Sequence, residues 1–593
     1  MKQFFITVAG VFAGLVLFFV VVPLVLIIGL VSAAQPAATP ARSVLELDLR
    51  RSLTDQDASG PFAAFSGDLS VMRIVRTLER AAGDNAVRGV LIRLPEGGME
   101  PAAAEEIRLA VRAFRERGKF VLAHSQGLMQ SGMTASTYML GASAEQLWMQ
   151  DGAPFQATGA GTEALFLGGL FQRYGVTPDF LQRYEFKNAV NEYTQTGFTP
   201  EHREATLGWL TSVFDNALAV AASDRRQTPQ AIRAAFESGP HSAAEARTRG
   251  LIDRIGSVAE VEAEARRRAG ADANADLLDF SEYARSETVT GSGPTIAVIG
   301  AEGPIVTGRA DGAGNPFASG GSIYSDAVAD AFAQAIRDTN VRAIVLRVNS
   351  PGGSDTASEQ ILTAVQAARR AGKPVVVSMG TYAASGGYWI SSGANAIVAQ
   401  PSTLTGSIGV FGGKLAFGEA LSRFGVNMEQ LNVGGPFTGA WSPSRPFTPE
   451  QRQAISTWMD RIYDQFLQRV ATGRRLPPQR VAEIARGRVW TGAQARQLGL
   501  VDELGGLNQA IARARREANI ADGESVRVRW IQSEQSPFEA LGRMFGASAN
   551  SVRTLAAAAW IFGDPRAQQV LDRLAEARLR QDGATVLQDR VLR

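Results

Sequence analysis

Two residues of the chain combine a reactive side chain with surroundings that suit nucleophilic catalysis. Ser407 lies in "TLTGSIGV", where small neighbours leave its hydroxyl open to the close approach of a substrate backbone. Lys187 is one of only five lysines in a chain with 60 basic residues, so each lysine raises the question of why it is not arginine. A buried lysine, unlike arginine, can be neutral near neutral pH and can then take a proton from serine. These residue types predict acyl transfer through a serine that a lysine activates.

Other residues compete for both roles. Ser385 in "AASGGYW" is a rival nucleophile, and Lys414, shortly after Ser407, is a rival base. The small residues around Ser407 would also suit an ordinary turn. Lys119 and Lys373 occupy equivalent places before two apolar runs, so we interpret both as structural.

Histidine, cysteine and overall charge exclude several other functions. The histidines are His124, His202 and His241, all far in sequence from Ser407, so a Ser/His/Asp triad would need a distant histidine. The chain has no cysteine, which excludes disulfides, thiol catalysis and cysteine-ligated metal. Its net charge of +2 gives no indication of nucleic-acid binding. We expect neither a cofactor nor a metal ion.

The chain contains two similar copies of one unit. "VRGVLIR" from Val87 matches "VRAIVLR" from Val341, "AVRAFRERGKFVL" matches "AVQAARRAGKPVV", and "EARTRGLIDRIG" matches "QARQLGLVDELG". The matching blocks keep the same order in both halves, which indicates a duplicated domain. In each copy short apolar runs alternate with amphipathic stretches of roughly 15 residues, a pattern typical of βαβ units. The sequence therefore predicts an α/β fold with parallel sheets flanked by helices.

The differences between the copies indicate one composite site. Ala160 and Ala135 of the first copy stand opposite Ser407 and Ser385 of the second, so the first copy lacks both serines. The second copy has "VGGPFTGAWSP" where the first has "RYEFKNAVNEYT", so it lacks a counterpart of Lys187. We therefore expect serine and lysine to meet at the interface of the copies, where burial would lower the lysine pKa.

Backbone donors for a reaction oxyanion are expected from the motif "SPGGS". Its glycines, Gly352 and Gly353, lie between an apolar run and a helical pattern. Backbone N–H groups at such a place can stabilise the negative charge of a tetrahedral intermediate. A turn is the ordinary interpretation of two adjacent glycines.

The N-terminal segment predicts a membrane anchor. No charged residue occurs from Phe4 to Val31. A helix of this length would extend about 42 Å, which exceeds the roughly 30 Å of a bilayer core. A cleavable signal peptide is the alternative, although its apolar stretch is normally only about 7 to 15 residues.

Together, the apolar segment and the repeat divide the chain into four expected parts. These are an anchor and linker (1–40), a first repeat (41–285), a second repeat (294–525) and a C-terminal helical tail (526–593).

Several motifs resemble one family of bacterial proteases. "NSPGGS", "YAASGGYWISSGANAIVAQPSTLTGSIGVFGG" and "WTGAQARQLGLVDELGG", with the N-terminal anchor and the degenerate first copy, are similar to the signal peptide peptidase A (protease IV) family in its long, duplicated form. The resemblance extends from the anchor to about Ala514. It implies tandem ClpP/crotonase-like domains and a Ser/Lys dyad peptidase, with Ser407 as nucleophile and Lys187 as base.

The resemblance also implies a location, substrates and an assembly. It implies a single-pass protein of the bacterial inner membrane whose catalytic domains lie in the periplasm. Signal peptides and other unfolded hydrophobic peptides would be its substrates, and no cofactor would be needed. The chains would form a homotetramer with its eight domains arranged as a bowl above the membrane. In the related Clp proteases the nucleophile has a position like that of Ser385, which keeps Ser385 as a rival.

Two other classes of function stay open at the level of sequence. A crotonase-type acyl-CoA enzyme would share the fold and the oxyanion glycines, but it would need neither an anchor nor a split serine and lysine. A non-catalytic membrane scaffold is disfavoured because Ser407 and Lys187 are retained in complementary copies. A fluorophosphonate probe that labels Ser407 would separate a peptidase from both.

Overall fold

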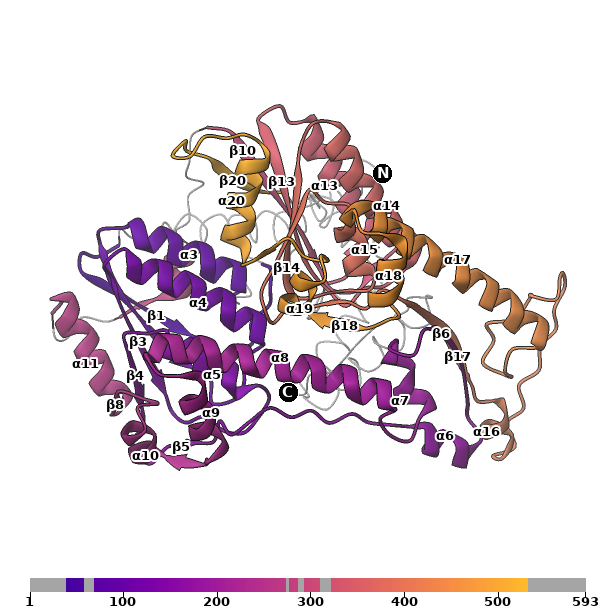
Figure 1. The fold of residues 1–593 in the computed structure, drawn as a ribbon, viewed down its shortest axis with the longest axis horizontal. Coiled ribbons are helices and arrows are strands. Elements are labelled where there is room, and N and C mark those ends of the chain that lie inside the picture. Colours follow the sequence, from indigo (N-terminus) through magenta and orange to yellow (C-terminus); the bar gives the residue numbers. More distant parts are fainter. Residues whose placement is uncertain (1–38, 58–68, 273–276, 286–292, 310–320, 532–593) are drawn as a thin grey trace, which may run out of the picture.

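The chain forms two α/β units, each built on a mostly parallel sheet (Figure 1). The computed structural model describes residues 39–57, 69–272, 277–285, 293–309 and 321–531. The predicted anchor and most of the predicted C-terminal tail lie outside these residues. Among the helices within the described ranges, none is both long and apolar enough to cross a membrane.

The first unit contains a six-stranded parallel sheet with the order β8-β4-β3-β2-β1-β9. Every residue of β2 except Arg88 is buried, as expected for a strand that helices cover on both faces. Its strands are β1 (Ser43–Asp48), β2 (Val87–Leu94), β3 (Phe120–Ser125), β4 (Gln146–Met149), β8 (Arg254–Ile255) and β9 (Leu278–Asp279). The short strands β5 (Pro154–Phe155) and β7 (His241–Ser242) do not belong to this sheet.

The helices of the first unit include α8, which is long and begins at a strong start signal. The Thr199 side chain accepts the N–H of His202, and Pro200 occupies the first helical position. The helices are α3 (Val71–Gly83), α4 (Pro101–Glu116), α5 (Thr134–Ala142), α6 (Gly168–Tyr174), η3 (Asn188–Val190), α7 (Asn191–Thr194), α8 (Pro200–Arg225), α9 (Pro229–Glu237), α10 (Ala243–Thr248), α11 (Val258–Ala269) and α12 (Phe280–Arg285).

The second unit contains an eight-stranded sheet that follows the path β18-β16-β14-β13-β10-β20, with β15 and β19 beside β14. Only the β16–β18 pair is antiparallel. Its strands are β10 (Thr295–Glu302), β13 (Val341–Ser350), β14 (Val375–Ala384), β15 (Ala396–Ala399), β16 (Leu404–Gly406), β18 (Val489–Thr491), β19 (Glu503–Leu504) and β20 (Arg527–Ile531), while β11 (Ile305–Val306) and β12 (Ile323–Tyr324) form a separate pair.

The helices of the second unit repeat the start signal of the first. Thr448 caps α17 and Pro449 is its first residue, as Thr199 and Pro200 are for α8. The helices are α13 (Ser325–Arg337), α14 (Asp355–Arg370), α15 (Gly386–Ser392), α16 (Gly418–Ser422), α17 (Pro449–Arg474), α18 (Pro478–Ile484), α19 (Gly492–Gln497) and α20 (Leu507–Glu517).

The two sheets share one topology. The path β19-β15-β14-β13-β10-β20 of the second unit repeats β8-β4-β3-β2-β1-β9 of the first. Lys119 Nζ lies 2.5 Å from the carbonyl oxygens of Ala81 and Asp84 at the C-terminal end of α3. Lys373 donates to the equivalent carbonyls at the C-terminal end of α13, at 2.7 and 2.6 Å. Both lysines therefore hold a helix end against the following strand, as structural residues would.

The first residues of the predicted helical tail form a strand instead. Residues 527–531 make up β20, which pairs in parallel with β10 at the edge of the second sheet. Their sequence "RVRWI" alternates charged with apolar residues, a pattern that suits an edge strand better than a helix. Val528 and Trp530 are partly buried against the core of the second unit.

An antiparallel ribbon joins the two units. Strand β6 (Thr177–Arg183) of the first unit pairs along its whole length with β17 (Val410–Ala416) of the second. The Asp179 carboxylate in β6 is buried, accepts the Phe447 N–H at 2.7 Å and is also bonded by Arg452. The ribbon ends close to Lys187, so it carries residues of the first unit onto the second.

Candidate active site

The structure brings Lys187 of the first unit between two serines of the second. Lys187 Nζ lies 3.0 Å from Ser407 Oγ, 2.9 Å from the Ser407 carbonyl oxygen and 3.1 Å from Ser385 Oγ. The expected meeting of lysine and serine at the interface of the copies is thus present in the geometry. The lysine contacts the rival hydroxyl of Ser385 as closely as it contacts that of Ser407.

The backbone around Lys187 is held against the second unit at close range. A Cβ atom at Gly487 would lie 2.6 Å from Lys187 Cβ, and Gly487 has φ +81°, so glycine is required there. Beside it, Arg486 forms an ion pair of 2.6 Å with Glu185. These contacts fix the position of the lysine backbone relative to the serines.

Burial controls the protonation of Lys187. The side chain is 1% exposed, and desolvation of the ammonium lowers the pKa of Lys187 from its ordinary value of 10.5 to about 7. At neutral pH a large fraction of the side chain is therefore a free amine. The site holds a group that can accept a proton in the physiological range.

The two serines differ in exposure and in backbone setting. Ser385 is partly exposed and stands at the turn between β14 and α15, with φ 55° and ψ −119°. A nucleophile on a tight strand-to-helix turn presents its hydroxyl to a substrate. Ser407 is only 1% exposed, and its N–H donates to the Arg488 carbonyl at 2.8 Å.

The expected oxyanion glycines lie beside Ser385. A Cβ atom on Gly352 would lie 2.8 Å from both Ser385 Cβ and the Gly386 nitrogen, and one on Gly386 would lie 3.1 Å from the Gly353 nitrogen. The Gly352 N–H already donates to Ser350 Oγ at 3.1 Å. Within the described residues, the N–H groups of Gly353 and Gly386 have no acceptor. Gly353 and Gly386, rather than Gly352, therefore offer the free donors.

Sequence reasoning did not assign a role to Gly386. It is the first residue of α15, and the first N–H groups of a helix have no partner within the helix. Its place directly after Ser385 in "ASGGYW" was the available signal, because a serine at a strand-to-helix turn is followed by such a donor.

The rival base Lys414 is occupied elsewhere. Its Nζ donates to the carbonyl oxygens of Ala440 and Ser442 at 2.5 and 2.8 Å and lies 4.4 Å from the centre of the Phe447 ring. Among the hydrogen bonds of the described residues, none joins Lys414 to Ser407. Lys414 thus ties the ribbon strand β17 to the loop before α17.

The three histidines are placed within the first unit, away from the serines. Two of them contact carbonyl oxygens and the third faces an amide: His124 with Gly256, His241 with Ala235, and His202 with Asn191. Within the described part of the chain, no cluster of side chains could hold a metal ion.

A buried charge cluster joins the two units. Arg347 of β13 is 1% exposed and donates to the Asp55 carboxylate at 2.9 Å and to the Glu106 carboxylate at 2.7 Å. Asp55 and Glu106 belong to the first unit. The signal in the sequence was an arginine inside the apolar run "AIVLRV", where a charge needs buried partners.

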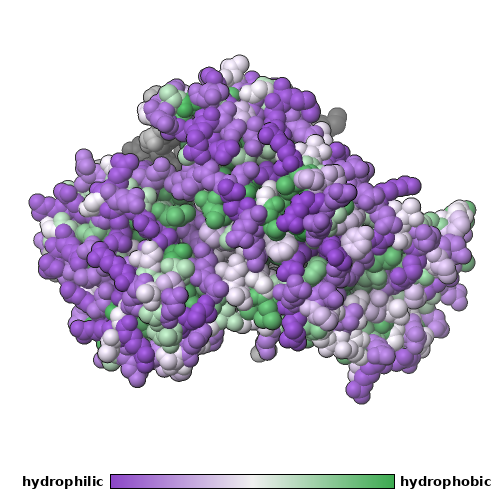
Figure 2. Space-filling model, viewed as in Figure 1, coloured by the Kyte–Doolittle hydropathy of each residue, from purple (hydrophilic) through white to green (hydrophobic). Residues whose placement is uncertain are grey.

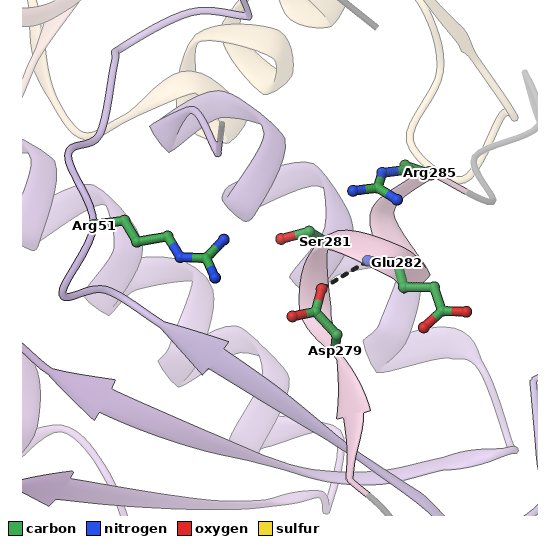
Figure 3. Close-up of a pocket in the computed structure, with 5 residues that line it drawn as sticks. All are labelled: Arg51, Asp279, Ser281, Glu282 and Arg285. Carbon is green, nitrogen blue, oxygen red and sulfur yellow. Dashed lines mark hydrogen bonds between the residues drawn. The ribbon is translucent and has the colours of Figure 1, made fainter. Parts of the chain in front are cut away.

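A separate surface pocket lies on the first unit beside β9 (Figure 3). There the Asp279 side chain accepts the Glu282 N–H at 3.0 Å, so it acts as the cap of α12. Figure 3 shows Ser281 at this pocket, but the residues that line it include no lysine. Its lining residues are Arg51, Asp279, Ser281, Glu282 and Arg285.

Comparison with known proteins gives one family. The family model "Peptidase family S49" matches residues 113–272 and 367–521, one region in each unit. The chain is 34% identical over 498 residues to Protease 4 of Salmonella typhi, covering 80% of this chain and 78% of that protein. It is 29% identical over 487 residues to the chloroplastic serine protease SPPA of Arabidopsis thaliana, covering 81% and 69%.

Among solved structures, the chain is similar to a lysine-to-alanine mutant of the 1510-N membrane-bound stomatin-specific protease in complex with a substrate peptide. The sequence identity is 16% and the TM-score 0.26, over 41% of this chain and 94% of that one. The duplicated family regions and the Protease 4 relatives confirm the resemblance seen in the motifs. The chain belongs to peptidase family S49 and is a serine peptidase with two copies of the family domain.

Proposed function

We propose that this serine peptidase cleaves peptide bonds with a lysine from its first unit and a serine from its second. The observation that carries the proposal is the buried Lys187 amine, which lies within 3.1 Å of two serine hydroxyls and has a pKa lowered to about 7. A lysine in this state can activate serine without histidine.

We propose Ser385 as the nucleophile, in place of Ser407, which the motifs favoured. Ser385 is partly exposed and has the free amides of Gly353 and Gly386 beside it. A substrate carbonyl can therefore reach the hydroxyl and the oxyanion donors together. Ser407, at 1% exposure, has no such access and instead holds the lysine through its hydroxyl and its carbonyl oxygen.

The hydrogen bonds of Lys187 fit this assignment. As an ammonium, Nζ has three N–H groups for its three oxygen neighbours. As a neutral amine it has two N–H groups and one lone pair. The Ser407 carbonyl must accept one N–H, and Ser407 Oγ can accept the other. The lone pair then accepts the hydroxyl proton of Ser385.

The reaction follows from these positions. Lys187 takes the proton of Ser385, whose Oγ attacks the peptide carbonyl carbon, and the N–H groups of Gly353 and Gly386 stabilise the oxyanion. The lysine ammonium then gives its proton to the leaving amine, which leaves an acyl-enzyme ester on Ser385. Water attacks this ester with Lys187 again as base, which releases the acid product and restores both residues.

We further propose that the substrates are signal peptides and other unfolded hydrophobic peptides in the cell envelope. An uncharged segment from Phe4 to Val31 supports a membrane anchor. The family resemblance of the motifs is the support for placing the peptidase units in the periplasm and four chains in an assembly. Membership of a peptidase family favours this function over an acyl-CoA enzyme or an inactive scaffold.

A fluorophosphonate probe followed by mass-spectrometric mapping tests the proposal. We expect the label on Ser385, no label or peptide hydrolysis in Ser385→Ala, and a loss of both by about 100-fold or more in Lys187→Arg, because arginine cannot act as a base. Ser407→Ala should keep the label on Ser385 while hydrolysis slows. Lys414→Ala is the matched lysine control and should keep full activity.

Two results would contradict this account. A label on Ser407 in the wild-type chain would restore Ser407 as the nucleophile. Full hydrolysis in Lys187→Arg would show that the lysine is not the base.

A further inference from the structure

Strand β14 departs from regular pairing just before the chain reaches Ser385. Between β13 and β14 the parallel register is even up to Val348 opposite Met379, and the next pair is Ser350 opposite Ala383. One residue of β13, at position 349, therefore lies opposite residues 380–382, which form a β-bulge in β14. Bulges occur next to active sites, where they change the direction of a side chain.

The first unit allows a comparison within the same chain. Its strands β2 and β3 are the equivalents of β13 and β14, and their register is even up to Leu94 opposite Ser125. The first unit also has Ala135 in place of Ser385. The bulge thus belongs to the copy that has the serine, and the described pairing of β2 with β3 in the other copy does not contain it.

The side chain of Asn349 holds the bulge from the side of β13. Its Oδ1 accepts the Tyr382 N–H at 3.0 Å, so a backbone donor that the bulge takes out of the ladder still has a partner. Its Nδ2 donates to the Glu302 carboxylate at 3.2 Å. That carboxylate also accepts the N–H groups of Asp55 and Gln56 of the first unit, each at 2.9 Å. The Asn349 amide is therefore held with its oxygen toward the bulge.

Two threonines hold the same part of β14 from the side of β16. The Thr403 hydroxyl donates to the Gly380 carbonyl at 2.8 Å, and the Thr405 hydroxyl donates to the Ala383 carbonyl at 2.7 Å. Both threonines are buried. A Cβ atom on Gly380 would lie 3.2 Å from both Cβ and Oδ1 of Asn349, so glycine leaves the room that the clamp needs.

The bulge lies inside the second unit. Figure 1 shows β14 in the interior of that unit, near β18 and α19. Nine of the ten residues of β14 are buried, and in the space-filling view of the same face other side chains cover the middle of the unit (Figure 2). The side chains that hold the bulge therefore act on the strand rather than on a substrate.

The bulge lies close in sequence to the reacting groups on both strands. Ala383 and Ala384 alone separate it from Ser385. On the other strand, three residues separate Asn349 from Gly353, whose N–H has no acceptor within the described residues. The bond of Asn349 to the bulge thus connects the strand that leads to the serine with the strand that leads to the oxyanion donor.

We propose that Asn349 and Thr403 are positioning residues of the peptidase reaction. Their hydrogen bonds hold the bulge, and the bulge sets where Ser385 Oγ lies relative to Lys187 and Gly353. The inference rests on the proposed role of Ser385 as nucleophile. Loss of either side chain leaves a buried backbone group without its partner, so the strand shifts. A misplacement of about 1 Å at the reacting atoms can slow a reaction about 100-fold.

Substitution of Asn349 tests the proposal in the full chain purified in detergent. We expect Asn349→Ala to lower kcat for a fluorogenic peptide about 10- to 100-fold and to change KM less than about twofold, because it displaces the reacting atoms rather than the bound substrate. Fluorophosphonate labelling of Ser385 should slow by the same factor. Asn395→Ala is the matched control and should keep the wild-type kcat. Asn395 Oδ1 accepts the Val375 N–H at 3.0 Å, so this variant removes an equivalent bond at the other end of β14.

Thr403 provides a second test from the opposite side of the strand, which also decides the matter if Asn349→Ala does not fold. Thr403→Val keeps the shape of the side chain but lacks the hydroxyl that the Gly380 carbonyl accepts, so kcat and the labelling rate should fall while KM stays unchanged. Thr403→Ser restores the hydroxyl and should recover most of the lost kcat. Circular dichroism and urea unfolding check that each variant is folded.

The possible outcomes separate this inference from the proposed nucleophile. If the wild-type label is on Ser385 but folded Asn349→Ala and Thr403→Val chains react at the wild-type rate, the positioning role is wrong and the nucleophile stands. A fall in kcat of equal size in Asn395→Ala would show a general effect of weakening β14 and would also overturn the role. A wild-type label on another serine would overturn the proposed nucleophile, and this inference with it.

Discussion

At the scale of the residue, Lys187 changes its chemistry because it is buried. Desolvation lowers its pKa to about 7, while the unfolded chain has the ordinary value of 10.5. Between these values the unfolded state binds a proton that the folded state has released. The lysine therefore destabilises the fold at low pH, and this cost disappears as pH rises from about 7 to 10.5. This loss of stability is the consequence of burying a lysine that, in the proposed reaction, must be neutral to act as the base.

The rate of peptide hydrolysis should rise with pH through the pKa of Lys187. We expect kcat/KM to increase tenfold per pH unit below the midpoint, to reach half its maximum near pH 7 and then to level off, because only the free amine accepts the serine proton. Steady-state assays with a fluorogenic peptide measure this profile.

The histidines supply the control for the pH profile. A chain with His124, His202 and His241 all replaced by glutamine should keep the same midpoint, since none of them contacts the serines. A flat profile between pH 5 and 9, or a midpoint that moves in this variant, would refute the role of the lysine.

The sequence predicted that Lys187 meets a serine, because each copy has lost what the other kept. It favoured Ser407 as that serine, whereas we propose Ser385. Ser385 and Ser407 both stand among small residues, and only the folded structure gives their exposure and the position of the free amides of Gly353 and Gly386. The choice of nucleophile depends on the course of the backbone around each serine, which cannot be predicted from residue types alone.

At the scale of the element, strand β13 and helix α4 hold the site together through charge. Arg347 of β13 is enclosed by the carboxylates of Asp55 and Glu106, all nearly inaccessible to water. A buried pair of this kind adds little net stability while complete, but it is costly to break. Its geometry fixes how the first unit sits on the second, and thereby where Lys187 meets the serines.

Removing the arginine should therefore be far more costly than removing its counterpart in the first unit. We expect Arg347→Ala to lower the free energy of unfolding by about 3–5 kcal/mol, because two buried carboxylates lose their partner. Arg93, in the matching strand β2, pairs with the partly exposed Glu46 at 3.3 Å, so Arg93→Ala should lower the free energy of unfolding clearly less. Urea unfolding followed by circular dichroism measures both. Equal losses would contradict a structural role for the cluster.

Local pattern predicted the sheets, but it did not predict the ribbon between the units. The apolar runs and their order indicated parallel strands in both copies. Pairing of β6 with β17 joins residues more than 200 positions apart and depends on how the units pack. Strand β20 was missed for a similar reason, since "RVRWI" becomes a strand only beside β10.

At the scale of the whole molecule, two copies of one fold share one site. In the proposed site, the second unit supplies Ser385, Ser407 and the oxyanion donors, while the first supplies Lys187, which follows β6 in the chain. The covalent connection of the copies places serine and lysine in the same chain at a fixed ratio. Every chain should therefore hold its own complete site, whatever contacts it makes with other chains.

Co-expression of two inactive variants tests this central claim most directly. Chains with Lys187→Ala and chains with Ser385→Ala, carrying different tags, are purified as mixed assemblies through both tags. Wild-type chains co-expressed with chains that carry both substitutions serve as the control and should retain activity in proportion to their share. If each site is built within one chain, the mixture of single variants should hydrolyse peptide no faster than either variant alone. Substantial recovery of activity in that mixture would show that the lysine and serine come from different chains.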